Sequence, residues 1–238
     1  MDTLIAISPS IGLFSRPVIV FLLLLGLSLG IRRAPPAAEA GVALWFAIAV
    51  PLLGWFLLAT WIGQTELYQL FPPARLLATL AVPLVWLALL TRSRRFMAVL
   101  AAIPPAWLIA LQLYRVLGFV FLVQWAAGRV PGAFALPAGI GDIATGGLAV
   151  PVACWAAWRW PHWRLAGYAW NVLGLADFAI ALSIATFVAP TGLRYPLIMI
   201  PTFSVPLAIV LHVLSLWQLA RSEESSVVSY QLSARPVP

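Results

Sequence analysis

The chain has 238 residues, of which 63% are hydrophobic and only 9% are charged. Soluble globular domains carry about a quarter of their residues as charged side chains, so this composition excludes a soluble fold and indicates an integral membrane protein. The formal net charge of +7 comes from arginine alone, because the sequence contains no lysine. The arginines gather in short loops between apolar runs, which is typical of oriented membrane proteins and argues against a nucleic-acid partner.

The first apolar run covers residues 17–31 and predicts a transmembrane helix, because Pro17 suits a first helical position and two arginines close the run. A cleaved signal peptide is the competing interpretation, since residues 38–40 are similar to a small-residue cleavage site. Asp2 before the run and the arginines after it reverse the charge order of a signal peptide, so we expect a retained helix.

Six further apolar runs predict an all-α polytopic membrane protein. The third run is short, residues 96–103 predict an interfacial segment, and the Gly/Pro-rich residues 128–141 predict an irregular outer turn. The Ser/Glu-rich tail from residue 221 predicts disorder. We therefore expect one seven-helix transmembrane domain over residues 1–220 and a disordered cytoplasmic tail over residues 221–238. The predicted helices are residues 17–31, 41–62, 75–90, 105–127, 142–158, 164–188 and 197–219.

The loop arginines predict the orientation of the seven helices. With the N-terminus outside, nine arginines fall on the cytoplasmic side and four outside, and Arg115 is buried, which accounts for all 14. This distribution satisfies the positive-inside rule, so we predict a cell-membrane protein with its C-terminus in the cytoplasm. The cytoplasmic arginines are Arg32, Arg33, Arg92, Arg94, Arg95, Arg159, Arg164, Arg221 and Arg235, and the outer ones are Arg16, Arg75, Arg129 and Arg194.

Two opposite charges are predicted near the membrane midplane. Arg115 lies about 15 Å along the fourth helix and Asp177 about 20 Å along the sixth, at 1.5 Å per residue. The apolar core is about 30 Å thick, and an unpaired charge at that depth costs at least about 2.5 to 3.5 kcal/mol. We therefore predict an ion pair between Arg115 and Asp177.

Asp142 has two interpretations. It is predicted at the start of the fifth helix, where a carboxylate accepts unpaired backbone N–H groups and opposes the helix dipole. It also follows directly on the Gly/Pro-rich outer turn, where it would belong to a functional site. The sequence leaves both interpretations open.

Further polar residues in the predicted spans complete the set of candidate ligand-binding residues. Gln112 lies one turn before Arg115 and can orient it, and Tyr114 adjoins the arginine in sequence. Asn171 is typical of a residue that hydrogen-bonds between helices. His212 is expected to be a packing histidine. The candidate ligand-binding residues are Arg115, Asp142, Asp177, Gln112, Tyr114 and Asn171.

The sequence Gly139-Ile140-Gly141-Asp142 resembles the GxGD signature of intramembrane aspartyl proteases. That resemblance implies a second aspartate on an earlier helix, sharing a proton with the first. No aspartate lies upstream within the predicted membrane region, and the resemblance covers four residues. Proteolysis is therefore the lower-ranked alternative.

Several other site classes are excluded or disfavoured. Seven helices resemble the microbial rhodopsins, but retinal attachment needs a lysine, which is absent. A b-type haem needs facing histidines, whereas His162 is predicted in a loop. The single cysteine, Cys154, gives no disulfide or cysteine-based metal site.

The remaining features are a polar cluster within the bundle and a Gly/Pro-rich segment beside it. They favour binding or passage of a small molecule, with Arg115 attracting an anion, over enzymatic activity. The main alternative is a structural or assembly subunit of a larger membrane complex. The expected partners are the lipid bilayer, a small-molecule ligand and membrane proteins or further copies of the chain, with no nucleic acid. The sequence identifies no cofactor.

Overall fold

The computed structural model describes residues 2–34, 38–65, 72–188 and 193–233, and within these ranges it is all-helical, with no strand. The predicted all-α fold is confirmed. The elements are α1 (Asp2–Arg33), α2 (Ala38–Gln64), α4 (Pro72–Leu90), α5 (Arg94–Ala102), α6 (Pro105–Leu111), the 3₁₀ helix η1 (Gln112–Gly118), α7 (Phe119–Ala126), α8 (Gly132–Ala157), α9 (Trp163–Ser183), the π-helices η2 (Ile184–Val188) and η3 (Ile200–Ser204), and α10 (Val205–Ser233).

Six helices in the described ranges are long and apolar enough to cross a membrane. The sequence predicted seven, and the difference is α4. Its described apolar part, Thr79–Leu90, is shorter than a span. The six candidate spans are Ser15–Arg33, Gly41–Gln64, Pro105–Ala126, Gly132–Ala157, Trp163–Val188 and Ile200–Arg221.

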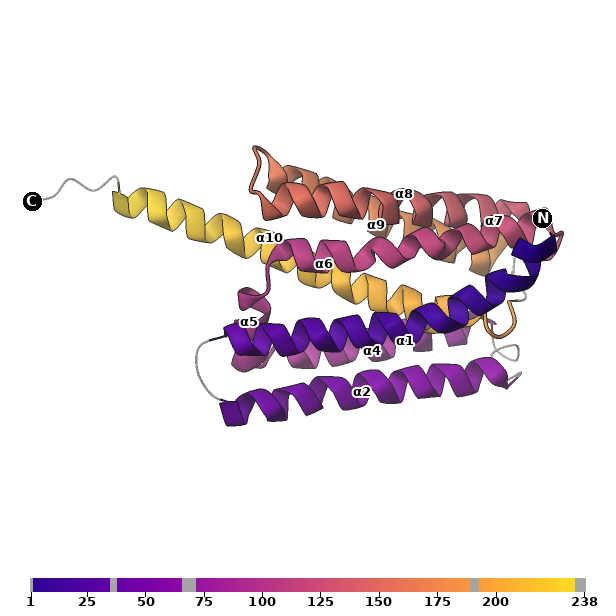
Figure 1. The fold of residues 1–238 in the computed structure, drawn as a ribbon, viewed down its shortest axis with the longest axis horizontal. Helices are drawn as coiled ribbons and strands as arrows, with labels where there is room; N and C mark the ends of the chain where they lie inside the picture. The colour runs from indigo at the N-terminus through magenta and orange to yellow at the C-terminus, as the bar shows by residue number, and fades with distance from the viewer. Residues whose placement is uncertain (1, 35–37, 66–71, 189–192, 234–238) are drawn as a thin grey trace, which may run out of the picture.

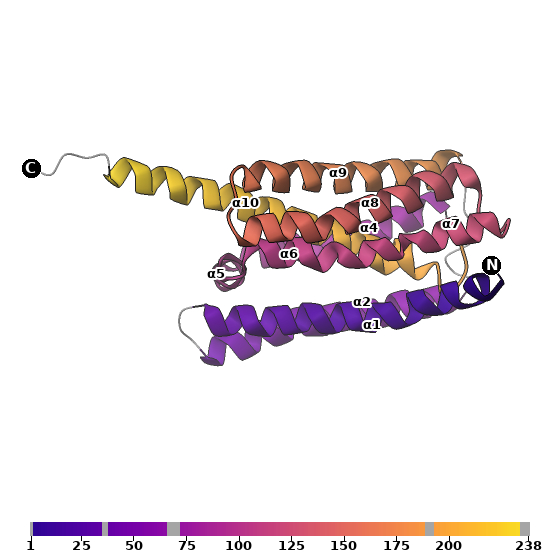
Figure 2. The ribbon, with the colours of Figure 1, turned by 45° about the horizontal axis from the view of Figure 1, so that its top comes forward.

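The helices form two groups with α10 between them. Figures 1 and 2 show α1 and α2 side by side at one side of the bundle and α8 with α9 at the other. α10 crosses between these groups and packs on α9, α6 and α4. The span formed by α6, η1 and α7 contacts both α8 and α1. Residues of this middle span are therefore the ones that can join the two groups.

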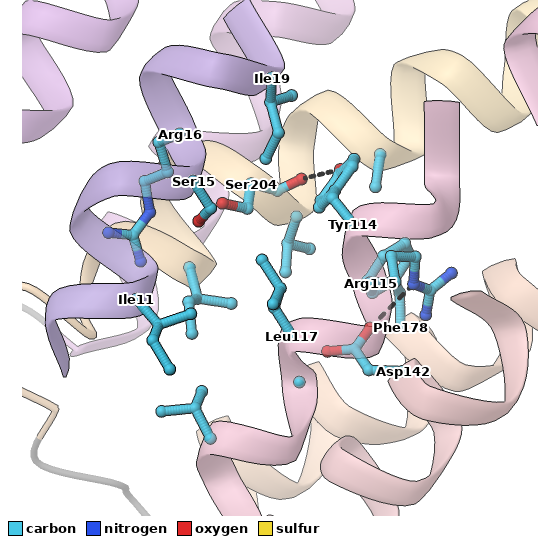
Figure 3. A pocket seen from close by; sticks show the side chains of 15 residues that line it. Ile11, Ser15, Arg16, Ile19, Tyr114, Arg115, Leu117, Asp142, Phe178 and Ser204 are labelled. Carbon is cyan, nitrogen blue, oxygen red and sulfur yellow. Dashed lines mark hydrogen bonds and ion pairs between the residues drawn. The ribbon is translucent and has the colours of Figure 1, made fainter. Parts of the chain in front are cut away.

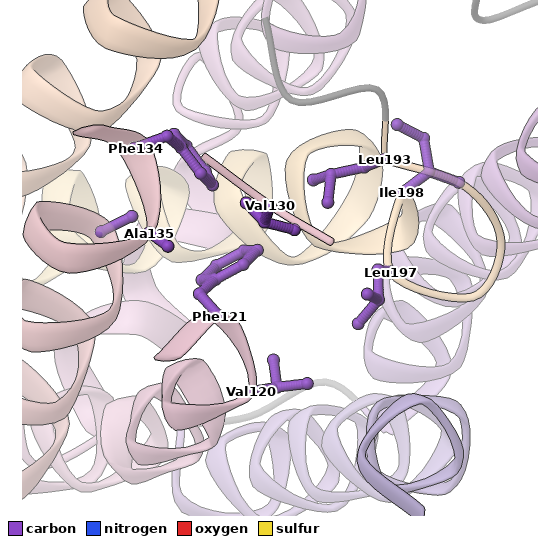
Figure 4. Close-up of a cluster of buried hydrophobic side chains, with 9 residues drawn as sticks. Val120, Phe121, Val130, Phe134, Ala135, Leu193, Leu197 and Ile198 are labelled. Carbon is purple, nitrogen blue, oxygen red and sulfur yellow. The ribbon is translucent and has the colours of Figure 1, made fainter. Parts of the chain in front are cut away.

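Apolar clusters lie on both sides of the polar residues along α8. One cluster gathers Phe134 and Ala135 of α8 with Phe121 of α7 and residues around Leu197 (Figure 4). The rings of Phe121 and Phe134 meet edge to face, with centroids 5.2 Å apart. A second cluster starts at Ala149 of α8 and includes residues of α6, α9 and α10. Asp142 lies on α8 between the two clusters, so both ends of the polar region are closed by apolar packing.

The C-terminal region differs from the prediction. Disorder was predicted from Arg221, whereas α10 continues as a helix to Ser233. Extending an existing helix adds a hydrogen bond per residue without a new nucleation cost, which is why a polar segment can continue it. Residues 234–238 lie outside the described ranges. The last candidate span begins with the π-helix η3, which contains Pro201.

Candidate functional site

Arg115 lies on a short 3₁₀ helix within the candidate span Pro105–Ala126. Residues three apart align on one face of a 3₁₀ helix, and the buried residues of η1 are Gln112, Arg115 and Gly118, each three after the last. In an α-helix, which has 3.6 residues per turn, side chains at this spacing would point in progressively different directions. The 3₁₀ geometry therefore presents all three residues to the interior of the bundle.

Arg115 binds two carboxylates. Its Nε donates to Oδ1 of Asp142 on α8 at 2.8 Å, and its Nη2 donates to Oδ2 of Asp177 on α9. Arg115 is 3% exposed and each aspartate 8%. The predicted pair of Arg115 and Asp177 is confirmed, and Asp142 is a second partner that the sequence did not predict. One guanidinium thus ties three spans together.

A relay of neutral groups continues from Arg115 to α10. Nη1 of Arg115 lies 3.1 Å from Nε2 of His212, and Nδ1 of His212 lies 2.8 Å from Oδ1 of Asn171. Because arginine can only donate, Nε2 must accept and Nδ1 must carry the proton that it donates to Asn171. The amide nitrogen of Asn171 in turn donates to Oγ of Ser215 at 3.1 Å. His212 is therefore a fully buried, hydrogen-bonded part of the network.

The position of Asp142 corrects the predicted boundaries of the fifth helix. α8 begins at Gly132, so Asp142 lies well inside it and does not cap its N-terminus. The segment predicted as an irregular turn, residues 128–141, is helical from Gly132 onward. The glycines of this segment indicated a turn, but small residues in membrane helices also allow close helix contact.

Three glycines of α8 show this close contact directly. A Cβ on Gly146 would lie 3.0 Å from the carbonyl carbon of Arg115, and one on Gly139 would lie 3.3 Å from the carbonyl oxygen of Gly118. A Cβ on Gly141 would collide with the carboxylate of Asp177. Glycine at these positions therefore lets α8 approach η1 and α9 closely enough for both carboxylates to reach Arg115.

A cavity of about 50 Å³ lies beside the network. Arg115 and Tyr114 of η1, Asp142 of α8 and Arg16 of α1 line it, together with apolar side chains (Figure 3). The hydroxyl of Tyr114 donates to the carbonyl oxygen of Ser204 at 3.1 Å. Three of the predicted site residues thus meet at one cavity.

The other three predicted site residues lie away from the cavity lining. Asp177 and Asn171 belong to the network behind Arg115. Gln112 donates to the carbonyl oxygen of Ala208 at 2.9 Å and forms no hydrogen bond with Arg115. It therefore links η1 to α10 and does not orient the arginine.

Arg16 is a second cation in the cavity lining, and it was not among the predicted site residues. Arg16 was placed outside the membrane, but it lies within α1 and within the candidate span Ser15–Arg33, and it is 2% exposed. Pro17 suggested the first residue of the helix, but proline is also tolerated inside helices in lipid, and α1 begins at Asp2.

Among the described residues, no group of His, Cys, Asp and Glu side chains could hold a metal ion.

A family model described as "Domain of unknown function (DUF8737)" matches residues 70–220, which is more than half of the chain. The chain belongs to this family. The residues matched to DUF8737 include Arg115, both of its aspartates and His212, whereas α1 with Arg16 lies before the match. No curated protein and no solved structure matches the chain.

Proposed function

We propose that this multi-pass membrane protein binds a small polar molecule inside its helix bundle and carries or senses it across the membrane. The observation that supports this proposal most is the cavity beside a buried ionic network, with one carboxylate oxygen on its wall. Charged side chains inside membrane spans are costly and usually mark a ligand or ion pathway. A seven-residue 3₁₀ segment within a span, such as η1, is also typical of a functional hinge.

The geometry changes the role that the sequence analysis gave to Arg115. Two carboxylates surround its guanidinium, so it has little capacity left to attract an anion. Asp142 is the better candidate for ligand contact. Arg115 holds its Oδ1, while the other oxygen lies on the cavity side of the carboxylate in Figure 3. Asp142 would therefore accept a hydrogen bond from the ligand, and Asp177 would fix Arg115.

The protease alternative is weakened by the same geometry. Aspartyl proteases need two carboxylates that share one proton. Here Asp142 and Asp177 each accept a hydrogen bond from the guanidinium of Arg115. Each carboxylate is thus engaged by an arginine, which is not the arrangement of a protease dyad, whose two carboxylates bond to each other.

Native mass spectrometry of the protein in a mild neutral detergent tests ligand binding. We expect wild type to retain a small molecule, and Asp142→Asn to lose it while still folding. Asp177→Asn is the matched control, because it makes the same change to a second partner of Arg115 that does not line the cavity. Retention of the same molecule by Asp142→Asn would contradict the proposal. A complex with another protein chain and no small molecule would favour an assembly subunit.

We also propose seven spans, with the N-terminus outside and the C-terminus cytoplasmic in the cell membrane. Figure 1 supports an odd number of crossings, since α1 begins at one end of the bundle and α10 leaves it at the other. The loop arginines support the orientation, and removing the buried Arg16 from the outer set strengthens the asymmetry. A reporter fused after Arg221 should be active in the cytoplasm. Activity only outside would contradict this topology.

A further inference from the structure

The cavity has charged side chains on two facing walls. Figure 3 shows Arg16 of α1 on one wall and Asp142 of α8, held by Arg115, on the opposite wall. In this view Leu117 lies between them, and the side chains of Ser15 and Ser204 lie near Arg16. Since α1 belongs to one helix group and α8 to the other, a molecule in this cavity would contact both groups at once.

Arg16 has no counter-charge in the part of the chain that the structure describes. Its Nε and Nη1 are buried and have no hydrogen-bond partner there, and the side chain's electrostatic neighbour is the phenol of Tyr195. The two buried aspartates are both held by Arg115. Arginine cannot lose its proton in a protein, so Arg16 remains a cation in an apolar setting. Such a group is stable only with an anion beside it.

Snorkelling does not explain Arg16. Arginines near helix ends usually keep the guanidinium in water while the stem covers apolar surface. Arg32 and Arg33 at the other end of α1 follow this pattern and are exposed, whereas Arg16 is 2% exposed. The described residues therefore give no partner that would offset the burial of the Arg16 guanidinium.

The size of the cavity limits the partner. About 50 Å³ corresponds to a few water molecules, since one water needs roughly 10 to 15 Å³ of such space. A carboxylate or a phosphate group fits this volume, and the guanidinium presents paired N–H donors that match the oxygens of either group. A bulky apolar ligand does not fit.

We infer that Arg16 binds the carboxylate or phosphate group of the ligand in this cavity, while Asp142 accepts a hydrogen bond from a hydroxyl or ammonium group of the same molecule. This inference rests on the proposed function and adds the chemical class of the ligand. Gly118 contributes by leaving space, since a Cβ there would lie 2.7 Å from Oδ2 of Asp142. The anionic group can come from a lipid headgroup or from a water-soluble molecule.

Thermal unfolding tests the inference, first with water-soluble anions and then with an anionic lipid. Wild type, Arg16→Gln and Arg129→Gln are melted in a neutral detergent with inorganic phosphate or acetate, against chloride at equal ionic strength. Arg129 is an exposed arginine in the turn before α8, so its variant controls for the lost charge. We expect wild type and Arg129→Gln to gain about 3 °C at ten times the Kd, and Arg16→Gln to gain nothing.

Nanodiscs of phosphatidylcholine with and without phosphatidylglycerol form the second arm. A stabilisation by the anionic lipid that Arg16→Gln lacks supports the inference and assigns the source to the lipid headgroup. A stabilisation by phosphate or acetate in detergent supports it and assigns a water-soluble ligand. If Arg16→Gln does not fold, Ile19→Trp replaces it, because it fills the cavity without changing charge and should abolish the response.

Two results would overturn the inference. One is an equal response of wild type and the cavity variant to every anion. The other is no response of wild type to any of the probes. If a neutral molecule nevertheless co-purifies with wild type and is lost in Asp142→Asn, the proposed function stands and only the anionic class is wrong.

Discussion

Arg115 and Arg16 line the same cavity and are both almost fully buried, but the residues that the structure describes supply counter-charges only to Arg115. Arg115 has two aspartates, a histidine and a backbone carbonyl within hydrogen-bond distance. Arg16 has unpartnered guanidinium nitrogens among the described residues. The first environment is that of a structural link between helices, and we infer that the second is that of a binding residue whose partner is a separate molecule.

The largest expected effect tests the link around Arg115. Arg115→Leu leaves two buried carboxylates without their cation, and breaking a buried pair from one side costs about 3 to 5 kcal/mol. The triple variant Arg115→Leu, Asp142→Leu, Asp177→Leu removes every charge and should recover most of that stability. Chemical denaturation followed by circular dichroism measures both. Equal losses in the single and triple variants would show that the three residues are not coupled.

The close contact of α8 with η1 predicts the next largest effect. Gly146→Ala places a methyl group against backbone atoms of η1, which cannot yield as a side chain can, so we expect a loss of about 1 to 3 kcal/mol or more. Gly147→Ala is the control, because nothing lies within 4 Å of its added Cβ. The same denaturation experiment should show little loss for it, or a small gain from helix propensity. Similar losses for both would argue against the packing described.

The relay through His212 predicts a smaller effect. His212→Asn is too short to span Arg115 and Asn171, so it leaves buried donors unpaired at about 1 to 3 kcal/mol. His162→Asn is a matched control at an exposed turn with positive φ, a conformation that asparagine tolerates. Thermal melting should separate the two variants. A neutral His212→Asn would remove the histidine from the network.

The sequence predicted the features that depend on amino-acid composition and on the depth of a residue in the membrane. Apolar runs located the six candidate spans, and the cost of an isolated charge at the midplane predicted the pair of Arg115 and Asp177. The prediction from sequence was wrong where one residue type has two structural roles, as glycine has in turns and in close helix contacts. Glycine before Asp142 serves helix contact and not a turn, so the start of α8 was predicted ten residues too late, at Asp142 instead of Gly132.

The other failures concern contacts between distant segments. Arg16 precedes Pro17, which looks like a helix start, and only the packing of α1 on η1 and α7 shows that the arginine is buried. His212 and Asn171 are far apart in sequence, and their pairing depends on how α9 and α10 cross. A single sequence contains no direct signal for either contact.

We propose that the described residues neutralise Arg115 and leave Arg16 for a ligand. The most direct test compares the melting temperature of Arg16→Leu with that of wild type, in neutral detergent and a buffer without phosphate or carboxylates. The claim predicts that Arg16→Leu melts at or above wild type, because the substitution removes a buried cation without a partner. A loss as large as that of Arg115→Leu would show that the chain itself pairs Arg16, and would contradict the claim.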